Sequence, residues 1–162
     1  MVDAGRLAAL LERVGSELVE LTALAEMTAQ DLRMDRFALP AAKYRLVVAL
    51  EAAIDAAEHL IASEGLRAST SFADTFAVLG ESGHLDGTLS EAMQDAARFR
   101  NLLVHGYADV DDERVVGILK TRLGDLERFR RVWQPSSAPT TDGVARLGAS
   151  GLRGRALGRE LW

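Results

Sequence analysis

Four polar side chains interrupt an apolar helical pattern in the string RFRNLLVHGYADVDDERV, residues 98–115. They are Arg100, Asn101, His105 and Tyr107, and they flank the apolar Leu-Leu-Val. A histidine exchanges a proton near neutral pH, and an arginine holds a phosphate with two hydrogen bonds. Such a pair suits cleavage of an RNA phosphodiester, because the substrate's own 2′-hydroxyl attacks and no metal ion is required.

The position of Gly106 predicts that a helix ends here, with His105 in its last turn. Asn101 then lies four residues earlier on the same face, and Arg100 is about 140° from His105 around the helix axis. The helix C-terminus favours an imidazolium ion, which suits a proton donor or a phosphate clamp. A histidine at a helix end is also an ordinary capping residue. The spacing alone therefore leaves open a helix end with only a structural role.

The complete string resembles the signature of HepT-type toxins of the HEPN superfamily, which is Arg, four residues, His, one residue, Tyr. Arg100, His105 and Tyr107 match it, and Asn101 fits the polar residue that follows the arginine. The segments VDDERV and FADTFAVLGESGHL (72–85) also resemble this family. The resemblance extends over roughly residues 5–134.

The resemblance implies an all-α HEPN-type bundle that forms a homodimer, in which two motif helices share a cleft. It implies a metal-independent endoribonuclease toxin in which Arg100 and His105 are catalytic, and we expect Asn101 to orient them. It also implies neutralisation by an MNT-type nucleotidyltransferase antitoxin, which transfers AMP to Tyr107. We expect no cofactor and no metal. Two copies of His105 across a two-fold axis would supply both the general acid and the general base.

Helical periodicity and capping signals predict about five helices. Their expected positions are Ala4 to Leu32, Pro40 to Gly65, a short helix capped by Ser71, one that a Thr88–Glu91 capping box opens and Gly106 closes, and one that begins near Asp109, Asp111 and Asp112 and ends near Trp133. These helices form an expected domain at 1–134. Residues 135–162, rich in Gly and Arg, are expected to form a flexible basic tail.

The composition limits the function classes. The 162 residues contain no cysteine, which excludes disulfides and thiolate chemistry. No run of about 18 apolar residues occurs, so we expect no membrane span and a cytoplasmic location. The net charge of −5 argues against general affinity for nucleic acid, although a local basic face can still bind it.

Weaker candidates for contacts with RNA are Lys43 and Arg45, at the start of the second expected helix, and Arg98 beside the motif. The alternative for the first group is that the charges are solvated and Tyr44 lies partly in the core. We also expect His59 to be solvated.

Two other functions stay open on the sequence alone. One is a non-catalytic module that binds a nucleotide or a partner and acts with a nucleotidyltransferase. The other is a purely structural bundle in which the motif is a capped helix end.

Overall fold

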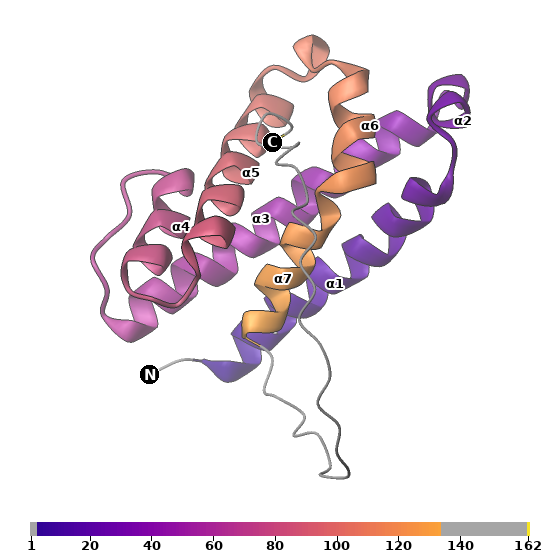
Figure 1. The fold of residues 1–162 in the computed structure, drawn as a ribbon. Coiled ribbons are helices and arrows are strands. Elements are labelled where there is room, and N and C mark those ends of the chain that lie inside the picture. Colours follow the sequence, from indigo (N-terminus) through magenta and orange to yellow (C-terminus); the bar gives the residue numbers. More distant parts are fainter. Residues whose placement is uncertain (1–2, 134–161) are drawn as a thin grey trace, which may run out of the picture.

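Helix α3 (Ala38–Glu64) is the longest of the described helices and runs through the middle of the bundle (Figure 1). The computed structural model describes residues 3–133 and 162, and these residues contain helices and no strand. This agrees with the all-α expectation. The other elements are α1 (Ala4–Glu26), α2 (Ala29–Met34), α4 (Phe72–Glu81), α5 (Gly87–His105), the 3-10 turn η1 (Tyr107–Asp109), α6 (Asp112–Thr121) and α7 (Leu123–Val132).

Helix α3 is central because it carries small apolar residues on more than one face. Ala42, Ala49, Ala53 and Ala56 are completely buried. Alanine lets neighbouring helix backbones approach closely, and a helix that is apolar around its circumference must be covered on several sides. Accordingly α1, α4, α5, α6 and α7 all pack against α3. In Figure 1, α6 and α7 run one after the other between α1 and α5.

Two expected helices are each divided in the structure, so residues 3–133 hold seven α-helices rather than five. The expected Ala4–Leu32 helix ends at Glu26, because the Thr28 hydroxyl accepts a hydrogen bond from the Asp31 N–H (3.0 Å) and caps a new helix. The last helix is interrupted at Arg122, which closes α6 and precedes α7. Both breaks let the chain change direction around α3.

Some of the other predicted helix ends are confirmed and others are wrong. Gly65 ends α3 in the left-handed conformation (φ 65°), and Ser71 and Asp111 cap α4 and α6. The predicted Thr88–Glu91 box is wrong, since Asp86 accepts from the Leu89 N–H (2.9 Å) and starts α5 earlier. Pro40 is the third residue of α3 rather than the first.

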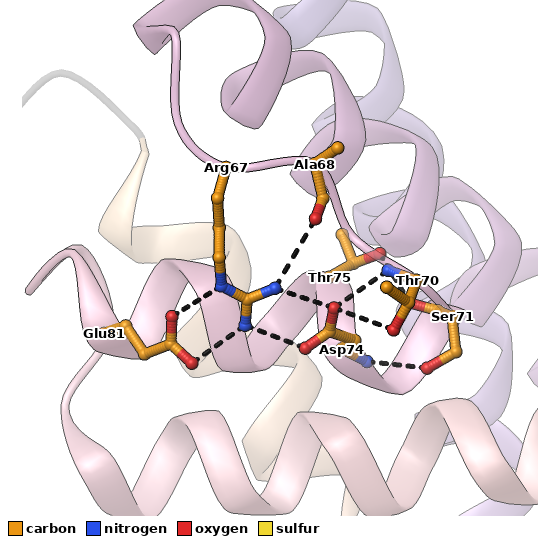
Figure 2. A network of polar contacts seen from close by, with 7 residues as sticks. All are labelled: Arg67, Ala68, Thr70, Ser71, Asp74, Thr75 and Glu81. Carbon is orange, nitrogen blue, oxygen red and sulfur yellow. Dashed lines mark hydrogen bonds and ion pairs between the residues drawn. The ribbon is translucent and has the colours of Figure 1, made fainter.

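An arginine network fastens the loop after α3 to helix α4 (Figure 2). The Arg67 guanidinium donates two hydrogen bonds to the Asp74 carboxylate and two to Glu81, all at 2.8 Å. Asp74 also accepts from the Thr70 N–H (2.8 Å). These bonds hold the pKa of Asp74 well below its usual range, chiefly through the hydrogen bond from Arg67. The network fixes the entry into α4, where Phe72 lies.

Trp162 is the one described residue beyond 133, and it is buried (5% exposed). Its ring meets Phe99 of α5 (centroids 6.1 Å apart), and its indole N–H donates to Asp125 Oδ2 (3.0 Å). The rest of the expected tail, 135–161, lies outside the described residues. Among the described helices, none has the length and apolar character needed to cross a membrane.

The close approach of α4 and α5 predicts a large effect of Gly80→Ala. A methyl group at Gly80 would lie 2.5 Å from Ser90 Oγ, which donates to the Phe76 carbonyl inside the bundle. We expect a loss of about 1–3 kcal/mol in the free energy of unfolding, measured by urea denaturation. Gly87→Ala is the matched control, since nothing lies within 4 Å of its added methyl. Equal stability of the two variants would contradict the packing described.

The Arg67 network predicts an acid-sensitive contribution to stability. Because folding lowers the pKa of Asp74, its stabilising effect is complete above the unfolded-state value of about 4 and is lost as the pH falls through the folded-state value. We expect Tm to fall less between roughly pH 4 and pH 2 in Asp74→Asn than in the parent chain. Thermal melts across this range test it, and parallel curves for the two proteins would count against it.

Candidate functional site

Helix α5 positions the motif, and its buried face fixes how the motif residues point. Phe99 and Leu103 lie in the core, so Arg100 and Asn101 project from the side of the helix toward the start of α4. The helix ends at His105, as expected, with Gly106 as its C-cap. Gly106 has φ −128°, so a left-handed conformation does not explain the glycine here. A Cβ at this position would lie 3.2 Å from the Leu102 carbonyl oxygen, so space favours glycine.

The Arg100 side chain is largely buried (15% exposed) and already has partners within the chain. Its Nη2 donates to Glu51 Oε1 of α3 (2.5 Å), and its Nη1 donates to Asn101 Oδ1 (3.2 Å). The guanidinium carbon lies 5.2 Å from the centre of the Phe72 ring. Its Nε is buried and has no hydrogen-bond partner among the described residues. These contacts hold Arg100 in place, and some of its N–H groups remain available to donate hydrogen bonds.

Two small cavities flank Phe72 on this side of the bundle. One, of about 160 Å³, is lined by Arg100 together with Glu51, Ile54 and Asp55 of α3. The other, of about 360 Å³, is lined by Asn101, Glu58 and the residues that lead into α4. Three carboxylates of α3 therefore face the region around Arg100 and Asn101. A phosphate that enters here must compete with carboxylates for the arginine.

His105 and Tyr107 lie apart from this arginine cluster. The His105 side chain is exposed and makes no hydrogen bond or ion pair with the described residues. Tyr107 is half-exposed (48%) and begins the turn η1. Within one chain the structure brings Asn101 to Arg100, and it joins neither of them to His105 or Tyr107 by a polar contact.

The Lys43 side chain is buried, so the alternative in which this charge is solvated is wrong. The residue is 8% exposed, and its ammonium pairs with Asp112 Oδ1 (2.8 Å) and donates to the Val110 carbonyl (3.4 Å). It also lies 5.1 Å from the centre of the Tyr107 ring. The neighbouring Tyr44 is 66% exposed, so the expectation that it lies partly in the core is wrong.

The remaining candidate cations are also paired within the chain. Arg45 contacts Glu17 Oε2 (3.0 Å) and Arg98 pairs with Asp95 on its own helix. His59 is half-buried, and its Nε2 is buried without a partner among the described residues, so the expectation of a solvated side chain is wrong.

A family model described as ribonuclease HepT-like matches residues 14–132. The chain belongs to the ribonuclease HepT-like family. The match covers most of the chain and includes Arg100, Asn101, His105 and Tyr107. The resemblance to HepT-type toxins is therefore confirmed at the level of the family.

Relatives and solved structures agree with this HepT-like assignment. The chain is 30% identical over 79 residues to the mRNA nuclease HepT of Shewanella oneidensis, a stretch that is 49% of this chain and 59% of that protein. Its fold is similar to a tri-AMPylated HEPN toxin of the same species in complex with MNT antitoxin (TM-score 0.73, 23% identity, 82% of this chain and 97% of the other). It is also similar to a toxin–antitoxin with AMP-PNP (TM-score 0.74, 21% identity, 79% and 96%).

Sequence reasoning missed the residues that hold the HepT-like motif in place. Arg100 contacts Glu51 and Phe72, and Lys43 contacts Asp112. In each pair the two residues are distant along the chain, and each of these three partners is an ordinary residue of a helix end or helix surface. Glu51 is a charged residue beside the apolar stripe of α3. Its side chain is 45% exposed, so burial does not require a cationic partner, and nothing in the local sequence marks it as the partner of Arg100.

Proposed function

We propose that this chain is the toxin of a toxin–antitoxin pair and that, as a homodimer, it cleaves RNA without a metal ion. The observation that carries the proposal is the arrangement at the end of α5. The exposed His105 imidazole lies five residues after Arg100, whose largely buried side chain is paired with Glu51 of α3. Membership of the ribonuclease HepT-like family and similarity to an mRNA nuclease support it.

In the proposed reaction the substrate supplies its own nucleophile. The 2′-oxygen forms a bond to phosphorus while the bond from phosphorus to the 5′-oxygen breaks, which leaves a 2′,3′-cyclic phosphate and a 5′-hydroxyl end. One His105 accepts the proton from the 2′-hydroxyl, and the His105 of a second copy gives a proton to the 5′-oxygen. Because the single chain exposes one motif histidine, both steps require the dimer.

Arg100 would stabilise the negative charge that develops on the phosphate. In the free chain it pairs with Glu51, so we infer that substrate displaces this carboxylate or uses the donors that Glu51 leaves free. Asn101, bonded to Nη1, would keep the guanidinium oriented. The pairing of Lys43, Arg45 and Arg98 with carboxylates reduces what each can contribute to RNA binding.

We further propose that an MNT-type nucleotidyltransferase neutralises the chain through Tyr107. The phenolic oxygen would attack the α-phosphorus of ATP held by the partner, pyrophosphate would leave, and the phenolic proton would pass to a base of the transferase. The half-exposed position of Tyr107, two residues after His105, supports this role. A bound AMP would block the adjacent cleft by its bulk and its negative charge.

One observation favours a second candidate, a non-catalytic module that binds a nucleotide or a partner. Arg100 is neutralised by Glu51, and Asp55 and Glu58 line the same region. Such an acidic surrounding disfavours a polyanion such as RNA, and within this second candidate it favours a partner protein over a nucleotide. This alternative predicts binding without any turnover that depends on His105.

The cleavage proposal is tested with purified, unmodified chain and RNA in the presence of EDTA. We expect His105→Ala to slow cleavage by at least about 100-fold, because proton transfer is lost. The products of the parent chain should carry 2′,3′-cyclic phosphate ends. His84→Ala is the control histidine variant, since His84 bonds to Ser82 and stacks on Trp133. If neither parent nor variant cleaves, or both cleave equally, the second candidate is favoured.

The competition at Arg100 is tested by Glu51→Gln. Removal of this partly exposed charge should tighten binding of a 2′-O-methyl RNA by about two- to fivefold, since such ion pairs are worth up to about 1 kcal/mol. Fluorescence anisotropy at fixed salt measures the Kd. Asp55→Asn removes a charge from the same cavity without breaking the ion pair and serves as the control. Weaker binding by Glu51→Gln would show that the ion pair orients Arg100 for the phosphate rather than competing with it.

A further inference from the structure

Lys43 connects helix α3 to the segment that carries Tyr107. Its two polar acceptors are the carbonyl of Val110, which directly follows η1, and the carboxylate of Asp112, the first residue of α6. A buried ammonium is stable only when it is paired, so these two contacts fix where the segment after η1 lies relative to α3. The residue is one of two lysines among 19 basic residues, and the other, Lys120, bonds to the carbonyls of Ala25 and Met27.

The turn that presents Tyr107 has little structure of its own. It is three residues long, and within it the Asp109 N–H bonds back to the Gly106 carbonyl (2.8 Å). A single 3-10 turn is weakly stable without tertiary contacts. Contacts from the helical body must therefore set where Tyr107 lies.

The Lys43 ammonium supplies such a contact to the tyrosine itself. It lies 5.1 Å from the ring centroid, within the range of a cation–π interaction. One side of the ring thus meets a buried charge, while 48% of the residue stays exposed. The ring is held from the α3 side, and the residue remains accessible from solvent.

We propose that Lys43 is a positioning residue for nucleotidyl transfer to Tyr107: it fixes the turn and the ring so that the phenolic oxygen meets the partner's nucleotide in one orientation. This inference rests on the proposed modification of Tyr107. Lys43 touches neither ATP nor the reacting atoms. Its effect on the reaction is to reduce the number of orientations that the phenol samples.

The test compares AMP transfer to the full chain and to Lys43→Met, which keeps an unbranched side chain but removes the ammonium and its charge. Each protein is incubated with ATP, magnesium and an MNT-type nucleotidyltransferase, and intact mass and peptide mapping follow the modification of Tyr107. We expect kcat for transfer to fall roughly tenfold, with a smaller change in KM, because orientation rather than docking is lost. Tyr107→Phe gives the background from other hydroxyl groups.

Two variants separate positioning from a general loss of structure. Lys43→Arg keeps a cation that can reach Asp112 and should restore most of the rate. Lys120→Met removes the other lysine, whose contacts are at the end of α1, and should leave the rate unchanged. Far-ultraviolet circular dichroism establishes that each variant is folded.

Amide hydrogen exchange at residues 107–109 provides a readout that does not need the transferase. Exchange should be faster in Lys43→Met than in the parent chain. Unchanged exchange together with an unchanged transfer rate would overturn the inference. If the parent chain accepts no AMP, the proposed modification fails, and exchange still decides whether Lys43 orders the turn: faster exchange supports this role and unchanged exchange refutes it.

Discussion

The burial of helix α3 on several faces is the constraint on which the rest of the structure depends. A helix whose alanines are completely buried cannot be stable in water until other helices cover it. Helices α1, α4, α5, α6 and α7 supply that cover. The breaks between α1 and α2 and between α6 and α7 let the chain change direction around α3. Thr28 caps the helix that follows the first break, whereas no side chain caps the start of α7 at Arg122.

Helix α3 also holds both ends of the motif segment. Glu51 binds Arg100 from one position on α3, and Lys43 binds the segment after Tyr107 from another, about two turns earlier. The motif is therefore divided: the arginine is turned toward the helical body, and the histidine is left exposed at the helix end. The proposed cleavage mechanism needs two histidines, and one chain supplies one motif histidine. The proposed chemistry therefore requires a second copy, and the proposed control requires a partner that reaches Tyr107.

Local signals predicted the elements better than their boundaries. Ser71, Asp111 and Gly65 are caps because their side chains or backbone act within a few residues, so the sequence contains all that is needed. The single helix expected over Ala4–Leu32 is wrong for a related reason: Thr28 can either continue a helix or cap one, and packing around α3 selected the cap. At the start of α5 the cap is Asp86, and Thr88 lies inside the helix; Gly87 and Thr88, which the earlier start adds, are both exposed, so burial does not explain this choice.

The sequence by itself determined the class of fold, the end of α5 at His105 and the family to which the chain belongs. These depend on periodicity, on capping chemistry and on a contiguous string of residues. Only the tertiary structure decided which charges are available. Arg100, Lys43 and Arg45 look alike in the sequence as free cations, yet each is paired with a carboxylate distant along the chain. Electrostatic interactions act through space at a few ångströms, and the fold alone determines which charges lie that close.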